Sequence, residues 1–449
     1  MPLSQKTIDI VKATAPAVAA NGDAIINTFY HDLLTNPDNA DIMVKFPHSH
    51  HISWPDDVEL DPTQLATDRR LHGHPVHKET GQQQHALLNA VVAYALNIEH
   101  LENLTDAVER IAHKHVQFQI PKEMYPRIGV TLLGAVKKVL GDAANDEVLE
   151  AWKEAYFFLA DIFIGLEGKM MAEIESEEGG WKGWRNFQVS EIRPDPLENL
   201  DVVHVYLKPQ DGGTLMRYDA GQSVTVRFID ELPLHTGAFD IEGRQEEIRN
   251  YTLSRAYDAD PSTYRISVRR EAGHGGPAGI VSSHIFENVN VGDVLRLAPP
   301  RGVHTLEKAP ESSEPIVLVG GGIGMTSVFA MFDAATRNPE QQRDIVLVHI
   351  VRDRNHRILE NEIRAAAERN PLARLIFVHT HPFDNEEAGV DFDLGGAVEF
   401  EDIAEHTGLN LTKAQWHFTG PIGFMEKWRT VLTEKHPDVE FFCEAYGPM

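Results

Sequence analysis

The stretch PIVLVGGGIGMTS, residues 315–327, decides the fold of the C-terminal part of the chain. An apolar run that predicts a buried strand ends in glycines, and a helix-like pattern begins directly after them. Glycines at such a turn let backbone N–H groups approach a pyrophosphate at the N-terminus of the helix. The spacing departs from G-x-G-x-x-G, because Ser327 stands where the third small residue would be. Even so, the glycines between strand and helix favour a dinucleotide site over the alternative, a tight strand–helix turn that binds no ligand.

The sequence around this turn alternates between strand-like and helix-like runs. Strand-like runs occupy residues 315–319, 345–351, 375–379, 415–418 and 439–442, with helical stretches such as residues 363–369 between them. This alternation predicts a doubly wound α/β nucleotide-binding domain over residues 312–449. Arg352 and Arg354 follow the second strand, where an arginine could meet the 2′-phosphate of NADPH. They could equally be solvated loop charges, so the choice between NADH and NADPH stays open.

Upstream of that domain, after Gly179 and Gly180, the apolar residues recur with a period of two. Strand-like runs cover residues 202–207, 223–228, 251–254, 264–269 and 294–297, separated by Gly and Pro. So many short strands predict an antiparallel β-barrel or sandwich over residues 181–305. The run that begins with Arg249, Asn250, Tyr251 and Thr252 is, by composition alone, best interpreted as an ordinary strand.

The first 172 residues have the periodicity of helices. One apolar face consists of Ile25, Ile26, Phe29, Tyr30, Leu33 and Leu34. Asn36-Pro37 ends that helix, and similar stripes follow over residues 87–98, 104–115, 128–140 and 149–167. We therefore predict an all-α domain over residues 1–172. The pattern disappears between about residues 47 and 81, where six histidines and four prolines indicate an insertion; a solvated loop is favoured there over a metal site.

His115 lies on the apolar stripe of its predicted helix, which is an unusual position for an imidazole without a partner. By itself this pattern favours a satisfied core histidine over a metal ligand. Glu167 continues the apolar stripe of the last helix, and a buried carboxylate needs a hydrogen-bond donor. His115 or Tyr125 could be that donor, and a carboxylate partner raises the basicity of a metal-bound imidazole.

Composition narrows the class of protein. The 449 residues suffice for several domains, and the net charge of -27 argues against nucleic acid or an anionic membrane as the main partner. No window approaches the ~20 uninterrupted apolar residues of a membrane span, and the N-terminus lacks the pattern of a secretory signal. The single cysteine, Cys443, forms no intrachain disulfide, which fits a reducing compartment. We expect a cytoplasmic monomer.

Taken together, these segments resemble the flavohaemoglobins, the globin-fused reductases that act as nitric oxide dioxygenases. The resemblance runs from Leu3 to Pro448 and omits only the insertion. Its most specific piece, IAHKHVQFQI at residues 111–120, is similar to the family's proximal-helix signature and implies that His115 ligates haem iron. It also implies a charge relay from Tyr125 and Glu167 to that histidine. The other globin positions that match functional residues of the family are Tyr30, Gln83, Leu87 and Lys114, whereas either Met43 or Phe46 could pack on the distal haem face.

In the reductase the resemblance turns several short motifs into one ordered set. It implies that Arg249, Asn250, Tyr251 and Thr252 form the R-x-Y-[ST] motif that holds FAD and its phosphate. The other cofactor positions that it implies are Gly279, Val281 and Ser282 at the flavin pyrophosphate; Gly322, Ile323, Gly324, Met325, Thr326 and Ser327 in the nicotinamide nucleotide loop; Gly420 and Pro421 near the nicotinamide; and Ala445, Tyr446, Gly447 and Pro448 in the tail on the flavin. The family usually has proline at Ala220 and Ser327, and cysteine at Thr419 and often Ala445, so the seating of the nicotinamide ring could differ here.

The resemblance implies a three-domain oxidoreductase: an all-α globin, an antiparallel β-barrel FAD domain and a doubly wound α/β nucleotide-binding domain. NAD(P)H would reduce FAD, FAD would pass single electrons to haem b, and nitric oxide would be oxidised to nitrate with O2. Three alternatives stay open at this point: a haem-linked peroxide or hydroperoxide reductase, a haem-based sensor of O2 or nitric oxide, and a flavin reductase whose globin has lost its oxygen chemistry.

Overall fold

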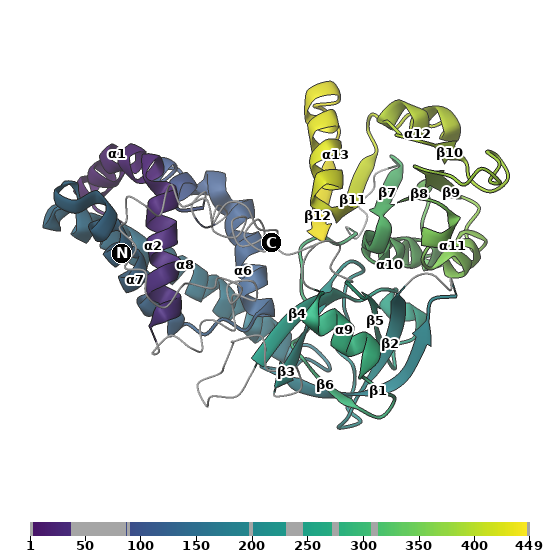
Figure 1. The fold of residues 1–449 in the computed structure, drawn as a ribbon, viewed down its shortest axis with the longest axis horizontal. Helices are drawn as coiled ribbons and strands as arrows, with labels where there is room; N and C mark the ends of the chain where they lie inside the picture. The colour runs from purple at the N-terminus through teal and green to yellow at the C-terminus, as the bar shows by residue number, and fades with distance from the viewer. Residues whose placement is uncertain are drawn as a thin grey trace.

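The computed structural model describes residues 3–36, 87, 90–196, 201–229, 246–271, 278–306 and 313–446. Along the chain it places a helical domain, an antiparallel β-barrel and a parallel α/β domain, and the predicted fold class is confirmed (Figure 1). The helical domain and the α/β domain both pack against the barrel, which lies between them in sequence. Among the described residues, no helix combines the length and the apolar character that crossing a bilayer requires.

The helices of the first domain pack around a main apolar core, and a second apolar cluster joins its later helices to the barrel. Its elements are α1 (Gln5–Ala20), α2 (Gly22–Thr35), a helical run at residues 90–96, η4 (Leu101–Leu104), α6 (Thr105–Gln117), α7 (Met124–Leu140), η5 (Gly141–Ala143) and α8 (Asp146–Ser176). Two of the helices begin with a capping side chain, because Ser4 accepts from the N–H of Thr7 and Asn145 from that of Val148. Five residues of the predicted stripe of α2 are buried in the main core: Ile25, Ile26, Phe29, Tyr30 and Leu33.

Helix α8 is longer than predicted from the sequence. We expected a helix over residues 149–167, but α8 continues to Ser176, beyond the predicted domain limit at residue 172. Its last turns pack Met170 and Ile174 against the start of the barrel rather than against the main helical core. The buried residues Phe163, Glu167, Met170 and Ile174 keep the helical spacing of three and four, so the apolar stripe continues past the predicted end of the helix. The exact domain limits stay predictions.

The middle domain is a closed barrel rather than a sandwich. Its strands are β1 (Arg185–Pro194), β2 (Val202–Pro209), β3 (Ser223–Ile229), β4 (Glu246–Thr252), β5 (Tyr264–Arg269) and β6 (Val294–Leu297), in the order β4-β3-β6-β1-β2-β5. The two outer strands meet where Leu253 pairs with Ile266 and the N–H of Ser254 donates to the carbonyl of Arg265 over 2.9 Å. Helix α9 (Ile280–Glu287) packs Val281 and Ile285 into the barrel core. This bridge and the hydrogen bond beside it close the sheet into a barrel.

Two strands of the barrel, β1 and β4, differ from the sequence prediction. Strand β1 was not predicted, because the register shifts between Val189 and Glu191 and so interrupts the period of two. Strand β4 begins at Glu246, well before the predicted start at residue 251. Its first residues are charged, and a polar strand carries no apolar alternation from which it could be recognised.

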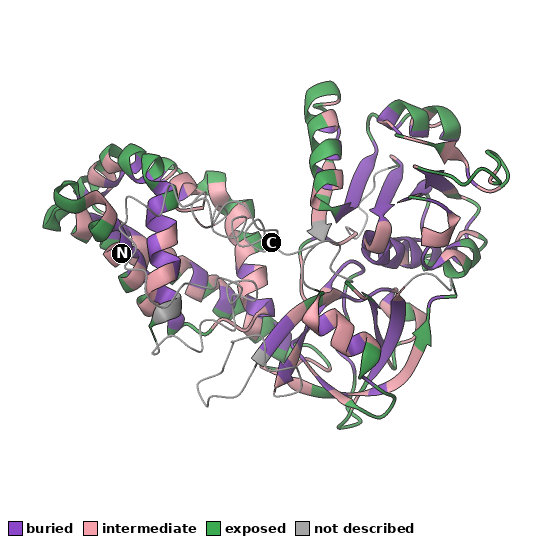
Figure 2. Ribbon diagram, in the orientation of Figure 1, coloured by how far each residue is buried: buried purple, intermediate pink, exposed green. Residues whose placement is uncertain are grey.

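The C-terminal domain is doubly wound around a parallel sheet. Its strands are β7 (Ile316–Gly321), β8 (Ile345–Val351), β9 (Ala373–His379), β10 (Leu394–Gly395), β11 (Gln415–Pro421) and β12 (Phe441–Tyr446), in the order β10-β9-β8-β7-β11-β12. Helices α10 (Met325–Arg337) and α11 (Glu360–Ala367) cover one face, and α12 (Phe400–Thr407) and α13 (Ile422–Lys435) cover the other. Figure 2 shows the buried strands between helices whose outer sides are exposed.

Polar contacts fix the α/β domain on the barrel. The Arg265 guanidinium of β5 forms an ion pair with Glu362 of α11, with the closest atoms 2.7 Å apart. The N–H of Leu359 donates to the Asp195 carboxylate over 3.0 Å, and the N–H of Ala256 donates to the Asp333 carboxylate over 3.1 Å. Because these contacts are buried or partly buried, they hold the two reductase domains in one arrangement.

Candidate functional site

Three helices of the N-terminal domain bring His115, Tyr125 and Glu167 together. His115 Nδ1 lies 2.7 Å from Glu167 Oε1 and 2.9 Å from the Tyr125 hydroxyl, and that hydroxyl donates to Glu167 Oε1 over 2.6 Å. Burial, together with the hydrogen bond to Glu167, raises the pKa of the Tyr125 phenol well above its ordinary value. Since the carboxylate can only accept, Nδ1 of His115 carries the hydrogen and Nε2 keeps the lone pair.

This donor set fits an axial ligand of haem. A neutral imidazole with its lone pair on Nε2 and a carboxylate behind Nδ1 is what a ferrous or ferric haem takes from its proximal side. The His115 side chain is about one third exposed, and Phe163 lies beside it with ring centroids 5.4 Å apart. In the described ranges, no cluster of three His, Cys, Asp or Glu side chains could hold a metal ion by itself. The single imidazole suits a metal whose other ligands come from a porphyrin.

The predicted distal residues are only partly within the described chain. Tyr30 of α2 is buried in the helical core against Phe29, and burial raises the pKa of its phenol. Leu87 packs, half-buried, on the same core. Gln83, the alternatives Met43 and Phe46, and the insertion at about residues 47–81 lie outside the described residues. Tyr30 and Leu87 thus share one core, as a common distal pocket requires.

Lys114 lies next to His115 on α6 and is half-buried. Burial lowers the pKa of its ammonium group, and the Glu444 carboxylate on β12 partly offsets that shift.

The four residues of the predicted flavin motif lie on β4, at the edge where the barrel closes. The Arg249 guanidinium contacts the Glu247 carboxylate over 2.7 Å and remains about one fifth exposed. Asn250 donates to Gln117 of the helical domain and contacts Thr225 on β3. Burial raises the pKa of Tyr251, and Thr252 is buried. A partly exposed arginine beside a tyrosine fits the phosphate and ring edge of a flavin nucleotide.

The predicted pyrophosphate turn caps helix α9. Gly279 is its N-cap residue, and the Ser282 hydroxyl donates to the Gly279 carbonyl over 3.1 Å. A Cβ at Gly279 would lie 2.6 Å from Ser282 Oγ, so a larger residue would require the Ser282 side chain to shift. Val281 is buried in the barrel core, which leaves its backbone N–H as the group that could contact a phosphate.

The glycine turn after β7 lies where the strand order reverses. Strand β7 pairs with β8 on one side and β11 on the other, and parallel sheets bind ligands outside the carboxyl ends of such strands. Gly322 has φ +54°, and a Cβ at Gly324 would lie 2.3 Å from the carbonyl oxygen of Thr419. The turns after β7 and β11 therefore touch, and the predicted residues Gly420 and Pro421 lie beside the nucleotide loop.

Side chains contribute little to that loop. Met325, Thr326 and Ser327 form the first turn of α10 and are all buried, with Met325 in the core beneath the sheet. The Thr326 hydroxyl donates to the Ile323 carbonyl over 3.0 Å, which closes the turn. The groups left for a pyrophosphate are the backbone N–H groups at the helix N-terminus.

Strand pairing brings the predicted flavin tail to the same place. Gly420 pairs with Ala445 and Pro421 pairs with Tyr446 in the parallel ladder of β11 and β12. Gly447 and Pro448 lie outside the described residues. The two motifs, distant from the glycine turn in sequence, thus end at one edge of the sheet.

The two arginines after β8 differ in their surroundings. Arg354 donates to the Asn385 side chain over 3.1 Å and forms an ion pair with the buried Glu386 over 3.5 Å. Arg352 is largely exposed, and its closest acidic group is Asp353 at 3.9 Å. Arg352 is therefore the guanidinium of the two that has room for a 2′-phosphate.

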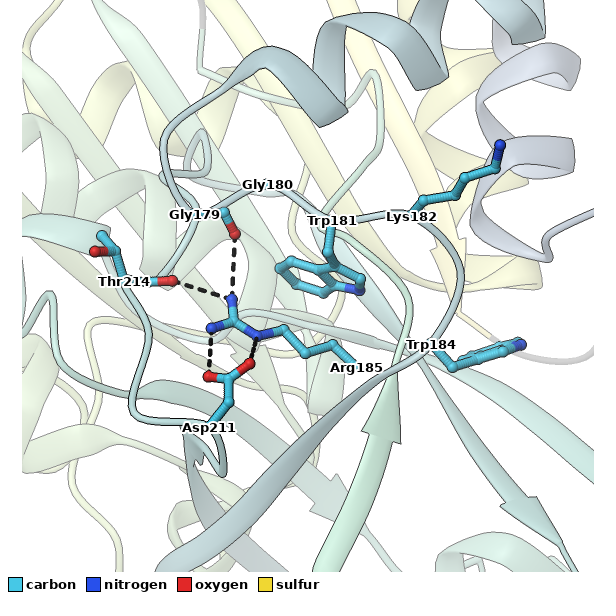
Figure 3. Close-up of a pocket in the computed structure, with 8 residues that line it drawn as sticks. All are labelled: Gly179, Gly180, Trp181, Lys182, Trp184, Arg185, Asp211 and Thr214. Atoms are coloured by element: carbon cyan, nitrogen blue, oxygen red, sulfur yellow. Dashed lines mark hydrogen bonds and ion pairs between the residues drawn. The ribbon is translucent and has the colours of Figure 1, made fainter.

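A cavity of about 440 Å³ lies at the link between α8 and β1, apart from the predicted cofactor residues (Figure 3). Figure 3 shows the Arg185 guanidinium clamped by the Asp211 carboxylate and by the carbonyls of Gly179 and Thr214. The Trp181 indole N–H donates to the Leu297 carbonyl over 3.1 Å. Because the arginine is already fully engaged, this cavity marks a structural link between domains rather than a ligand site.

Sequence reasoning missed two polar contacts between domains. His304, from the segment after β6, lies 3.4 Å from His417 of β11 and 3.7 Å from the Glu444 carboxylate. Gln117, the last residue of α6, donates to the Ser223 hydroxyl and the Arg301 carbonyl of the barrel. The only available signal for Gln117 was its place in the proximal-helix motif, two residues after His115.

The sequence profile of the oxidoreductase NAD-binding domain matches residues 318–430, and that of the globins matches residues 70–162. The flavohaemoprotein of Rhizobium meliloti (strain 1021) is 35% identical over 99% of this chain and 98% of its own length. The chain belongs to the flavohaemoprotein family. The flavohaemoprotein of Bordetella pertussis (strain Tohama I) is 36% identical over 96% of this chain and 95% of its own. The membership makes the chain an oxidoreductase and agrees with the order of its three domains.

The fold is also that of a solved relative. The crystal structure of a flavohaemoglobin from Malassezia yamatoensis, which contains FAD and haem, superimposes with a TM-score of 0.74 at 24% sequence identity. The match covers 99% of this chain and 100% of that one. The arrangement of helical, barrel and α/β domains is therefore shared along the whole length.

Proposed function

We propose that this flavohaemoprotein is a nitric oxide dioxygenase that uses NAD(P)H, FAD and haem b. The observation that carries the proposal is the joining of His115, Tyr125 and Glu167 in the globin domain of a chain that also has the NAD-binding domain of an oxidoreductase. Each pair of nitric oxide and dioxygen takes up one electron to become nitrate, so one NAD(P)H serves two turnovers. When bound, haem supplies the iron for oxygen chemistry, and FAD converts one hydride into two single electrons.

His115 would hold the haem iron through Nε2, while its neighbours hold its other nitrogen. Glu167 accepts the Nδ1 hydrogen and Tyr125 donates to the same carboxylate oxygen. A carboxylate in this position keeps the imidazole electron-rich and fixes its ring plane. Tyr30, with Gln83 and Leu87, would form the opposite, distal side, where a phenol can donate to a partly charged oxygen.

In the reductase, FAD would lie along β4 and the start of α9. Arg249 with Asn250, Tyr251 and Thr252 would hold its ring system and phosphate, and the turn at Gly279, Val281 and Ser282 would receive its pyrophosphate. The nicotinamide nucleotide would bind at residues 322–327, with Gly420 and Pro421 under its ring. The tail from Ala445 to Pro448 would then cover the flavin. The proximity of the turns after β7 and β11 supports this arrangement.

Nitric oxide and O2 are accordingly the proposed substrates, and NADH or NADPH the reductant. NAD(P)H is an intracellular metabolite, which supports the cytoplasmic location that the single cysteine predicts. A monomer remains our expectation.

The decisive experiment is aerobic consumption of nitric oxide by the purified holoprotein with NAD(P)H. We expect nitrate to form in step with nitric oxide loss, with two nitrates for each NAD(P)H oxidised. Consumption of peroxide or hydroperoxide in place of nitric oxide would identify the peroxide reductase instead. NAD(P)H-dependent reduction of artificial acceptors with no nitric oxide consumption would contradict the proposal and favour a flavin reductase.

The flavin part of the proposal has a separate test in Arg249→Ala. Loss of the guanidinium removes a fixed positive fork from the phosphate, so we expect weaker FAD retention and slower reduction of both haem and artificial acceptors. FAD content after gel filtration and acceptor reduction measure this. Full FAD occupancy with normal rates would remove Arg249 from the site.

A further inference from the structure

Gln117 connects the predicted haem-ligand helix to the predicted flavin strand. It ends α6 two residues after His115, yet its side chain leaves the helical domain and enters the barrel. Gln117 Nε2 donates to the Ser223 hydroxyl and to the Arg301 carbonyl, each over 2.7 Å. Gln117 Oε1 accepts from Asn250 Nδ2 over 3.3 Å. The residue is 4% exposed, so these bonds are shielded from water.

The orientation of this amide is determined by its partners. The Arg301 carbonyl can only accept, so the nitrogen of Gln117 must face it and the oxygen must face the Asn250 amide. Both N–H bonds and the carbonyl oxygen of the amide are then in use. Disturbing such an amide is costly, because a buried donor or acceptor that loses its partner cannot bind water in its place.

The barrel residues that receive Gln117 are themselves held in place. Ser223 and Arg301 pair through their backbones, with both N–H···O distances 2.9 Å. Asn250 uses its side-chain oxygen to contact Thr225 on the neighbouring strand β3. Asn250 is also part of the predicted flavin motif. The end of α6 is thus tied to the strand on which FAD would lie, at the β3–β4 side of the barrel (Figure 1).

We propose that Gln117 is a positioning residue that sets the distance and orientation between the haem-ligand helix and the flavin strand, and thereby the rate of electron transfer from flavin to haem. The proposal rests on the proposed function, because it requires FAD in the barrel and haem in the globin. The Gln117 side chain hydrogen-bonds one predicted cofactor residue, Asn250 on the flavin strand. Transfer between two redox groups falls steeply with their separation, so a rigid link at this point governs the transfer step and no other.

A second contact keeps the two domains together without Gln117. Arg301 Nη2 donates to the carbonyl of Met170 on α8 over 2.9 Å, and Glu173 lies 4.0 Å from the same guanidinium. Loss of the Gln117 contacts should therefore loosen the interface rather than separate the domains. This lets the geometry of transfer be tested in a protein that remains folded.

The test compares two Gln→Glu substitutions in the same turn of chain. Gln117→Glu has nearly the same shape but loses both donors and directs a carboxylate at the Arg301 carbonyl. Gln119→Glu is the matched control, because Gln119 Nε2 donates only within the helical domain, to the Val116 carbonyl over 2.8 Å. In the holoprotein, we expect Q117E to reduce its haem about tenfold more slowly in anaerobic stopped flow. Reduction of ferricyanide by NAD(P)H, which needs the flavin alone, should equal that of wild type, and Q119E should match wild type in both.

A measurement independent of turnover accompanies the rates. Hydrogen–deuterium exchange should rise in Q117E, and not in Q119E, in the peptides that cover residues 115–120 and 246–252. In a double-mutant cycle of Gln117→Leu and Ser223→Ala on haem reduction, the second change should add little to the first. Ser223→Ala alone removes one hydroxyl and provides the test if Q117E does not fold.

The outcomes separate the inference from the proposed function. Wild-type protein that contains FAD and haem but does not reduce its haem with NAD(P)H would contradict the proposed function itself. Normal haem reduction in wild type with equal rates in Q117E, S223A and Q119E would overturn the role of Gln117. Equal slowing of haem and ferricyanide reduction in Q117E would also overturn it, because Gln117 would then act on the flavin site.

Discussion

The proximal site of the globin domain depends on side chains, whereas the nucleotide turn of the α/β domain depends on the backbone. The first is made of three side chains, His115, Tyr125 and Glu167, one from each of three helices. The second is made of backbone, because Met325 and Ser327 are buried and Gly324 has no room for a side chain. Substitutions at the globin site should therefore act through the chemical type of the side chain. Substitutions at the nucleotide turn should act through the space that they take up beside the backbone.

The largest effect is expected at His115. His115→Ala removes the only predicted protein ligand of the iron, so the protein should purify with FAD but with little tightly bound haem. The haem-to-FAD ratio from absorption spectra measures this. His113→Ala, two residues away on the same helix, is the control and should keep its haem. Full haem content and an unchanged spectrum in His115→Ala would show that the proximal assignment is wrong.

The next largest effect is expected from a single methyl group added to the nucleotide turn of the α/β domain. Gly324→Ala would place Cβ 2.3 Å from the Thr419 carbonyl oxygen and push apart the turns after β7 and β11. Overpacking of this kind costs about 1–3 kcal/mol, and we expect it chiefly as a higher KM for NAD(P)H. Gly423→Ala is the matched control, since a Cβ there meets no described atom within 4 Å. Equal KM values in the two variants would contradict close contact between the turns.

Tyr30→Phe tests a side-chain effect on the distal side of the globin. A lost hydrogen bond to a partly charged ligand is worth roughly 1.5–3 kcal/mol, or about one to two decades in affinity. We expect faster oxygen release and slower nitric oxide turnover, with electron transfer from NAD(P)H to artificial acceptors intact. Stopped-flow measurement of oxygen dissociation gives the answer. An unchanged off-rate in folded protein would mean that Tyr30 is only a core residue of α2.

Acid should destabilise the reductase through His349, a side chain buried in the parallel sheet. Burial lowers the pKa of His349 to about 3. The unfolded chain takes up this proton near pH 6.5, whereas the folded chain resists it until about pH 3. Stability should therefore fall as pH drops below about 6.5, by up to roughly 1.4 kcal/mol per pH unit from this group. Urea unfolding of wild type and His349→Leu at several pH values should give a flatter dependence for the variant; parallel curves would contradict the assignment.

The smallest effect is expected at Ser327, although it belongs to the predicted nucleotide loop. Its hydroxyl is buried and has no hydrogen-bond partner among the described residues. Replacing it with alanine removes an unsatisfied polar group, so Ser327→Ala should keep its KM for NAD(P)H and change stability by less than about 1 kcal/mol. Steady-state kinetics and thermal unfolding measure both. A large rise in KM would show that the loop uses side chains after all and would weaken the contrast with the globin.

The sequence by itself determined the parts of this protein that depend on local pattern. Three periodicities, of helices, of short strands and of alternating strands and helices, predicted the three domains and their order. The apolar stripe that contains His115, and the glycines after the strand that ends at Val319, predicted where two of the sites begin. These signals are readable because amphipathic periods and turn residues act over a few positions along the chain.

Only the tertiary structure decided how those pieces meet. The pairing of Gly420 with Ala445, the closure of the barrel between Leu253 and Ile266, and the contact of Gln117 with Asn250 join residues far apart in sequence. Such contacts depend on strand register and on the packing of whole domains, and neither leaves a periodic trace in the sequence. The same reason explains why the sequence did not single out Gln117: its partners, Ser223 and Arg301, belong to another domain.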